Sequence, residues 1–147
     1  AHAASAHGIH VAETLAGEHP PLVRQENITR CIYTRLEAAS IGLSEEQAKE
    51  AGYDVKVTQS AFQGNAKALI KGENEGFIKL VIDQTYGEIL GAFIVGPHAT
   101  DLIGEVLGVK ASEGTIYELS EIIQPHPALL EAIGEGADAY FGSAIHM

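Results

Sequence analysis

At 147 residues, 46% of them hydrophobic, the chain is long enough to bury one substantial core, so we expect one main folded domain. Its formal net charge of -11 argues against nucleic-acid binding, because a phosphate backbone requires a basic protein face. No apolar run approaches the length of a membrane span, and no cleavable leader opens the sequence. These features predict a cytoplasmic protein with no nucleic-acid or membrane partner.

Residues 1–17 are rich in alanine and carry a rough helical stripe of apolar residues that ends at Gly17. We therefore expect one helix here. His7 and His10 share a face of this helix and His2 lies near its start, but no cysteine or carboxylate completes a metal site. We interpret the three histidines as ordinary helix residues and expect no metal.

Residues 18–26 include Pro20-Pro21 and predict a stiff polar linker, so the folded domain is expected to span residues 27–147. Residues 28–34 carry β-branched and aromatic side chains, which predict a strand. Cys31 in this strand is the only cysteine, so the chain can form no intrachain disulfide and no cysteine redox pair. We expect its thiol to be buried and inert.

The next segment predicts a short helix and a second strand. Ser44 and Gln47 form a capping-box pattern, and Gly52 is placed to end the helix that they begin. Residues 54–62 alternate apolar and polar side chains, as in a half-exposed strand. We expect a polar, alanine-containing link after this strand.

Two apolar runs, residues 77–82 and 89–95, predict a hairpin whose turn contains Gly87 at positive φ. We expect this hairpin to lie at the centre of the sheet. Both faces of the second strand are apolar, as expected where helices cover one face and another surface covers the second. Simple alternation places Ile89, Phe93 and Val95 on one face and Leu90, Ala92 and Ile94 on the other.

Three helices are predicted in the last third of the chain. Apolar residues at helical spacing follow a cap near Thr100, and this helix is expected to cover the sheet. Thr115 and Glu118 form a second capping box for a short helix that runs into Pro125. The final helix is expected to begin at Pro127, which suits a first helical position.

The final helix has an apolar side that must be covered. Gly134 and Gly136 weaken the helix by up to about 1 kcal/mol each relative to alanine, unless a close approach to another backbone compensates. The pattern leaves two interpretations open. The apolar side can pack in the core of the same chain, which is the commoner case, or against a second subunit.

The strongest candidate for chemistry is His126, which lies between Pro125 and Pro127. Pro127 restricts the backbone of His126 to an extended conformation, and we expect His126 to be the N-cap of the final helix. Glu131 lies five residues on, where its side chain can reach back to the imidazole. Such a dyad fixes the tautomer and orientation of the ring and favours the imidazolium, as a general acid/base requires. The alternative is an ordinary cap residue and a solvated glutamate.

Residues 29–34, 37–48, 76–81, 87–92, 94–99, 126–131 and 144–146 form a set of matching segments. Together they resemble the C-terminal interface domain of the flavin disulfide reductases, most closely the dihydrolipoamide dehydrogenases. The resemblance implies an α+β fold, with a mostly antiparallel β-sheet and helices packed on one face. It also implies that residues 1–17 are the last helix of a flavin-binding domain, which would then expose an apolar face.

The resemblance implies a homodimer in which each chain completes the active site of the other. His126 would be the acid/base beside the partner's flavin and cysteine pair, Glu131 would orient it, and the main chain at His126 and Pro127 would lie against the flavin. FAD and NAD would be cofactors of the longer enzyme, which oxidises dihydrolipoamide. The present chain would bind neither and would be inactive alone. A dihydrolipoamide acyltransferase subunit of 2-oxo acid dehydrogenase complexes would be a further partner, and the acidic surface suits a basic docking segment.

The sequence departs from the family pattern around this site. Gln124 stands where a second histidine is usual, Ala128 replaces a threonine, Leu36 replaces a proline, and Pro125 is unusual. Glutathione-type reductases share His-Pro with a glutamate five residues on, so an interface domain of another disulfide reductase is an alternative. A free-standing, non-catalytic dimerisation module is another. The segments at 96–99 and 144–146 favour dihydrolipoamide dehydrogenase.

Overall fold

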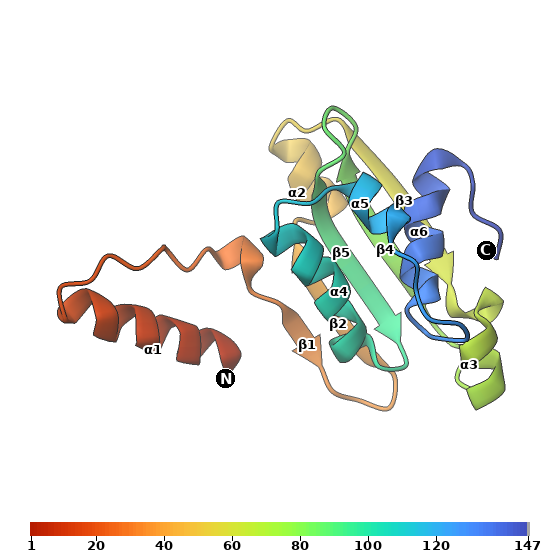
Figure 1. Cartoon of the computed structure of the whole chain (residues 1–147), viewed down its shortest axis with the longest axis horizontal. Helices are drawn as coiled ribbons and strands as arrows, with labels where there is room; N and C mark the ends of the chain where they lie inside the picture. The colour runs from red at the N-terminus through yellow and green to blue at the C-terminus, as the bar shows by residue number, and fades with distance from the viewer. Residues whose placement is uncertain (147) are drawn as a thin grey trace.

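The computed structural model describes residues 1–146 and shows one five-stranded antiparallel sheet in the order β1-β2-β5-β4-β3 (Figure 1). The α+β fold expected from the sequence is confirmed, and the β4–β5 hairpin includes the central strand. The strands are β1 (Arg30–Ile32), β2 (Glu37–Gly42), β3 (Val55–Ala61), β4 (Phe77–Asp83) and β5 (Ile89–Gly96). The helices are α1 (His2–Leu15), α2 (Glu45–Glu50), α3 (Ala66–Lys71), α4 (Ala99–Ala111), α5 (Ile116–Glu121) and α6 (Glu131–Phe141), with short 3-10 turns at Gln25–Asn27 and Phe62–Gly64.

Helices cover the two faces of the sheet unequally. On one face α4, α5 and α6 enclose the main core, to which α4 contributes Leu102 and Val106, and α6 contributes Ile133. On the other face a smaller cluster forms under α2, around Ala48 and Val81. Burying such apolar side chains stabilises the fold by roughly 1.5–3 kcal/mol each before entropy is counted.

The predicted faces of β5 are wrong at its first two residues. Ile89 lies in the main core with Ala92 and Ile94, whereas Leu90 lies in the smaller cluster with Phe93. The pairing of β4 with β5 shifts register at this end, which leaves Leu90 as an extra residue opposite β4. A bulge inserts one residue and exchanges the faces on its two sides, so strict alternation fails across it.

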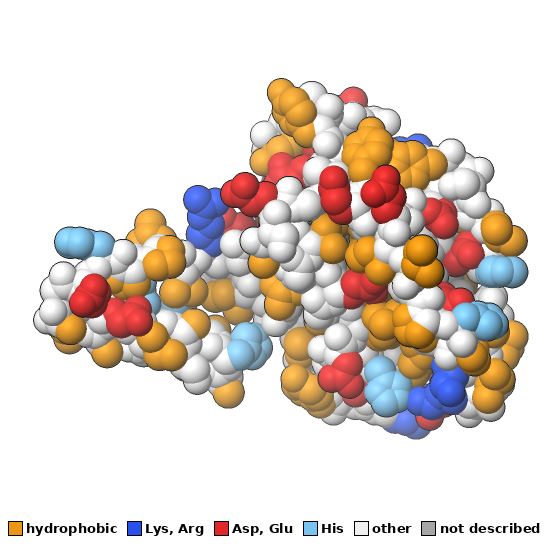
Figure 2. All heavy atoms as spheres, in the orientation of Figure 1, with side chains coloured by type: hydrophobic (Ala, Val, Ile, Leu, Met, Phe, Trp, Pro, Cys, Tyr) orange, Lys and Arg blue, Asp and Glu red, His pale blue; other side chains and the backbone are white. Residues whose placement is uncertain are grey.

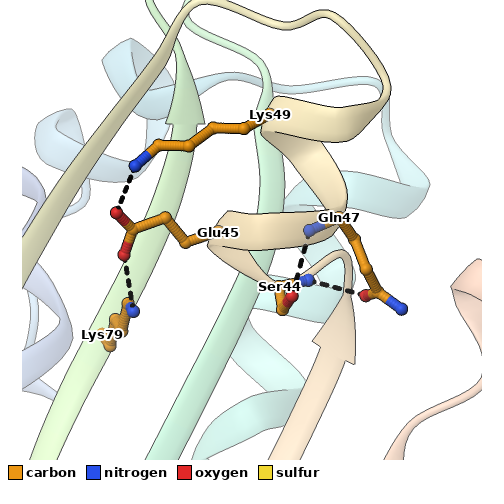
Figure 3. A network of polar contacts seen from close by, with 5 residues as sticks. All are labelled: Ser44, Glu45, Gln47, Lys49 and Lys79. Carbon is orange, nitrogen blue, oxygen red and sulfur yellow. Dashed lines mark hydrogen bonds and ion pairs between the residues drawn. The ribbon is translucent and has the colours of Figure 1, made fainter.

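Polar contacts fix α2 to the sheet (Figure 3). The Oγ of Ser44 accepts a hydrogen bond from the Gln47 N–H at 3.2 Å, and the Oε1 of Gln47 accepts one from the Ser44 N–H at 2.9 Å, which confirms the predicted capping box. Glu45 pairs with Lys49 at 2.7 Å and with Lys79 of β4 at 3.0 Å. The second pair ties the helix to the strand below it.

Two elements were absent from the sequence-based expectations. β2 forms from Glu37–Gly42, a segment of small residues with one β-branched side chain, because it pairs with both β1 and β5. α3 occupies the stretch that was expected to be a polar link. Asn65 caps it, since its Oδ1 accepts from the Ala68 N–H at 3.0 Å, and Gly72 ends it in the left-handed conformation at φ 69°.

A ladder of side-chain donors joins β3 to α6. Thr58 donates to the Gly136 carbonyl at 2.7 Å, Ser60 to the Ala132 carbonyl at 2.5 Å, and Lys56 to the Tyr140 carbonyl at 2.7 Å. The donors lie on alternate strand residues, and the acceptors lie four helix residues apart.

The apolar side of α6 is therefore covered by its own sheet. Gly136 lies against β3 and β4, where a Cβ would meet the Ser60 Oγ at 3.4 Å and the Leu80 side chain at 3.6 Å, both ordinary contact distances. Of the two interpretations left open by the sequence, packing in the core of the same chain is correct for this side of the helix.

The first helix stands apart from the rest of the fold. α1 extends away from the sheet on the segment that precedes β1 (Figure 1), and none of its residues is buried. Apolar side chains lie on the surface of this arm (Figure 2), among them Ile9, Val11 and Leu15. The predicted helix and its exposed apolar residues are confirmed. Across residues 1–146, no helix is both long and apolar enough to cross a bilayer.

Candidate active site

The side chains of His126 and Glu131 meet in the loop between α5 and α6. The imidazole Nδ1 lies 2.7 Å from the Oε1 of Glu131, so the hydrogen-bonded pair expected from the spacing is present. The helix position predicted for His126 is wrong. α6 begins at Glu131 with Leu130 at its N-cap, and His126 lies in the loop before it.

α6 starts later than predicted because the side chain of Glu131 folds back over the residues that precede it. Its Oε2 accepts a hydrogen bond from the Ala128 N–H at 2.7 Å, while its Oε1 meets His126. The N–H groups of Ala132 and Ile133 bond to carbonyls three residues back, as in a tight turn. Residues 129 and 130 therefore form a turn that leads into the helix, after a bend at residues 126 and 127.

Glu131 is held in its charged form. Burial alone would raise its pKa, but the hydrogen bond from Ala128 and the hydrogen bond and charge of His126 outweigh burial, so the pKa of the carboxyl is lowered. A charged Glu131 at the first position of α6 also interacts favourably with the helix dipole. The carboxylate can thus act as a fixed acceptor for the ring.

The other ring nitrogen of His126, Nε2, is open to solvent. The side chain is 72% exposed, against 29% for Glu131. Within residues 1–146, the Nε2 of His126 has no hydrogen-bond partner. One nitrogen is therefore locked, and the second is open to a group that does not belong to the described part of this chain. This arrangement suits proton transfer with an external donor or acceptor.

A cavity of about 160 Å³ opens beside the dyad. Asn65, Glu135 and His146 line it together with the dyad residues and small side chains. Glu135 accepts hydrogen bonds from the N–H groups of Ile145 and His146 at 2.8 and 2.9 Å, which brings the C-terminal segment to the edge of the cavity. Asn65 and Glu135 were not among the site residues predicted from the sequence. The helix-cap pattern of Asn65 was a usable signal, but nothing local marks Glu135.

Gln124 takes part in a second, more buried contact next to the dyad loop. Its Nε2 donates to the Oε1 of Glu105 on α4 at 3.2 Å, while the Oε2 of Glu105 is buried and finds no partner among residues 1–146. Burial raises the pKa of this carboxyl, and the bond from Gln124 offsets only part of the effect. A Cβ on Gly134 would lie 2.5 Å from the Gln124 side chain, so this glycine makes room for it.

The remaining candidates lie outside this site. Cys31 is partly buried against the main core, less deeply than expected. The Nε2 of His2 donates to the carbonyl oxygen of Thr29 at 2.8 Å. In residues 1–146, no group of three or more histidine, cysteine or acidic side chains is placed to hold a metal ion.

The sequence matches a family model described as the dimerisation domain of pyridine nucleotide-disulphide oxidoreductases, over residues 28–137. It is 44% identical over 146 residues to a dihydrolipoyl dehydrogenase of Bacillus subtilis, covering 99% of this chain and 31% of that protein. It is 41% identical over 147 residues to the dihydrolipoyl dehydrogenase of Zymomonas mobilis, covering 99% of this chain and 32% of that protein. The chain thus spans about a third of the length of these relatives.

Two solved structures share the fold. LpdA from Mycobacterium tuberculosis matches with a TM-score of 0.79 at 23% identity, covering 87% of this chain and 28% of that one. The flavoprotein disulfide reductase RclA from Escherichia coli matches with a TM-score of 0.79 at 22% identity, covering 87% of this chain and 30% of that one. At these identities the likeness describes the architecture alone.

Proposed function

The chain belongs to the family of dimerisation domains of pyridine nucleotide-disulphide oxidoreductases, and from this premise we propose that it is the dimerisation domain of a dihydrolipoyl dehydrogenase. In this proposal the chain pairs with a second copy, and the His126–Glu131 dyad of each chain serves the active site of the other. The observation that carries the proposal is the state of the imidazole. Its Nδ1 is fixed by Glu131, and its Nε2 is exposed and unpartnered within residues 1–146.

The dyad would act on the thiols of dihydrolipoamide. The Nε2 of His126 takes the proton of one substrate thiol, and the resulting thiolate attacks a cysteine disulfide of the partner, which releases the second cysteine as a thiolate. Glu131 stabilises the imidazolium formed in this step and keeps the ring in place. FAD and NAD, bound by the rest of the longer enzyme, would supply the electron transfer that follows. His126 and Pro127 are both exposed, and in this proposal their main chain lies against a flavin of the partner.

Exposed apolar side chains around the dyad support a contact with another chain. Ile123, three residues before His126, is 97% exposed, and Ile145 beside the cavity is 80% exposed. Covering such an exposed isoleucine with a partner stabilises the association by about 25 cal/mol for each Å² of apolar surface removed from water. Both residues flank the site that the partner is proposed to use.

Dimerisation is tested by light scattering on the 147-residue chain and two matched variants. Ile123→Glu should shift the chain toward monomer, because a charge would be buried at the contact. Tyr86→Glu is the control, since Tyr86 is 78% exposed in the turn between β4 and β5, at the opposite end of the sheet from α3 (Figure 1). A wild-type chain that stays monomeric at high concentration, or equal effects of the two variants, would count against the interface.

The acid/base role is tested in the longer enzyme that contains this domain. His126→Gln should lower turnover of dihydrolipoamide by about 10²- to 10⁴-fold while flavin remains bound. Near-normal turnover contradicts the role. Assaying the unmodified enzyme with dihydrolipoamide and with glutathione separates a dihydrolipoyl dehydrogenase from another disulfide reductase. A dimer of the natural protein without any reductase activity would indicate the non-catalytic module instead.

Two further contacts are part of the proposal. α1 would pack on the flavin-binding part of the longer protein, with residues 18–26 as its link to the domain of residues 27–147; the absence of buried residues in α1 supports this. A basic segment of an acyltransferase subunit would dock on the acidic surface, which the net charge of -11 and the acidic side chains in Figure 2 support. Calorimetry of that binding should show an affinity that falls as salt is added. An affinity independent of salt would argue against a charge-based contact.

A further inference from the structure

Asn65 is placed next to the dyad by the end of β3 and the start of α3. It follows the 3-10 turn Phe62–Gly64, and its side chain is 6% exposed. The Oδ1 of Asn65 accepts a hydrogen bond from the Ala68 N–H at 3.0 Å and so caps α3. Aspartate or serine could perform this capping equally well, because only an acceptor is needed. Capping therefore accounts for the role of the amide oxygen of Asn65 but gives no role to its amide nitrogen.

The amide nitrogen of Asn65 reaches the dyad loop. Its Nδ2 donates to the carbonyl of Ala128 at 2.9 Å. The N–H of Ala128 in turn donates to the Oε2 of Glu131 at 2.7 Å, and the Oε1 of Glu131 lies 2.7 Å from the Nδ1 of His126. Ala128 is thus held on both sides, by Asn65 through its carbonyl and by Glu131 through its amide. The chain of contacts runs from Asn65 through Ala128 and Glu131 to His126.

The loop that carries His126 has few other restraints. Within residues 1–146, no backbone–backbone hydrogen bond outside regular elements involves residues 123–128. Its polar contacts run through side chains, namely the bonds of Asn65 and Glu131 to Ala128, the bond between Gln124 and Glu105, and the dyad. The bond from Asn65 ties the peptide next to the His-Pro pair to the start of α3, 63 residues away in sequence.

We propose that Asn65 is a positioning residue for the acid/base dyad: its amide donor fixes the Ala128 carbonyl, which sets where Glu131 holds the imidazole. Asn65 lines the same cavity as the dyad, and within residues 1–146 its side-chain hydrogen bonds go to Ala128 and to Ala68 of α3. It acts through Ala128 and Glu131. The inference rests on the proposed function for its effect on rate, but its geometric part can be measured without any turnover.

The decisive substitution is Asn65→Asp. An aspartate keeps the acceptor that caps α3 and replaces the donor to Ala128 by an oxygen that repels the carbonyl. Asn65→Ser is a second variant, because serine also caps but is too short to bridge to Ala128. Ser44→Ala is the matched control for simple loss of a helix cap, at about 1 kcal/mol of stability. Ser44 caps α2 on the other face of the sheet and has no hydrogen bond to the dyad loop (Figure 3).

The first measurement is the ¹⁵N spectrum of the His126 imidazole in the 147-residue chain at matched pH, assigned with His126→Gln. Asn65→Asp and Asn65→Ser should change the Nδ1 signal, which reports the bond to Glu131, whereas Ser44→Ala should leave it unchanged. Unchanged spectra in both Asn65 variants overturn the inference and make Asn65 a helix cap only. If Asn65→Asp does not fold, Asn65→Ser gives the same decision.

The second measurement is turnover in the longer enzyme. Asn65→Asp should lower kcat about 10- to 100-fold and alter the pH profile with a smaller change in KM, because misplacing a catalytic group by about 1 Å can cost 10²-fold. Altered spectra with normal turnover in both Asn65→Asp and His126→Gln would sink the proposed function and leave the positioning role intact. If the spectra change but only His126→Gln loses turnover, the reaction tolerates a displaced imidazole. That result would contradict the proposal that Asn65 matters for the reaction.

Discussion

Replacing Glu131 by alanine or by glutamine separates its structural contribution from its chemical one. Alanine removes both acceptors, at 2.7 Å from Ala128 N and 2.7 Å from His126 Nδ1. We assign about 1.5 kcal/mol to the charged bond from the partly buried Ala128 amide. We assign about 0.5 kcal/mol to the bond with His126, because that ring is 72% exposed and solvent screens the pair. Alanine should thus destabilise the fold by about 2 kcal/mol.

Glutamine keeps one oxygen for the Ala128 amide and loses only the charge. It should destabilise by less than about 1 kcal/mol, which is the typical size of an exposed ion pair together with a helix-dipole contact. Thermal unfolding should show Tm lowered by about 6 °C for alanine and by less than about 3 °C for glutamine. Both variants should nevertheless lose acid/base activity in the longer enzyme to a similar degree. Equal losses of stability in the two variants would refute this division of roles.

The same residue gives a pH dependence of known sign. The pKa of Glu131 is lower in the folded chain than in the unfolded chain, so its stabilisation is fully present above the unfolded value of about 4.3. It is lost as the pH falls through the lowered folded value. The difference in Tm between the wild type and Glu131→Ala should therefore shrink in acid, as measured by unfolding at pH 7 and below pH 4. A constant difference would show that the charge of Glu131 does not contribute.

Three further substitutions test the surrounding structure. Thr58→Val keeps the shape of a buried residue but removes its bond to the Gly136 carbonyl, and should cost about 1 kcal/mol by denaturant unfolding. Glu105→Gln should raise stability by about 1 kcal/mol at pH 7.5 but not at pH 4, because the raised pKa makes the charged form costly only above the unfolded value; a gain at both pH values would contradict this. Gly42→Ala should cost about 3 kcal/mol or more, since Gly42 has φ +76° and its Cβ would lie 2.1 Å from the Leu90 carbonyl oxygen; normal stability would mean that the turn relaxes freely.

Local rules were sufficient wherever a local contact determines the element. The capping boxes at Ser44 and Thr115 form as the spacing predicts, and Gly87 takes a positive φ in its turn. The contact between His126 and Glu131 was one of two interpretations that the spacing left open, because a glutamate five residues after a histidine can reach it across a turn. What decided these features lies within a few residues of sequence.

Features that depend on contacts between residues far apart in the sequence could not be predicted from local patterns. β2 carries little strand propensity and forms because two neighbouring strands pair with it. The faces of β5 depend on a bulge opposite β4. The start of α6 is an exception, because it depends on a local contact, the hydrogen bond from Ala128 to Glu131, that the helix-cap patterns do not describe. Asn65 meets the dyad loop from 63 residues away, a contact that no local pattern indicates.

The most direct test of the account is complementation between two inactive forms of the longer enzyme. One form carries His126→Gln with an intact cysteine pair, and the other carries serine in place of that pair with an intact His126. In the proposed twofold dimer the dyad of one chain lies in the site of the other, so a mixed dimer should contain one complete site. Random exchange of subunits should then restore about a quarter of wild-type turnover, as half of the dimers are mixed and each has one working site. No recovery despite confirmed mixed dimers would show that His126 serves its own chain or takes no part in the reaction.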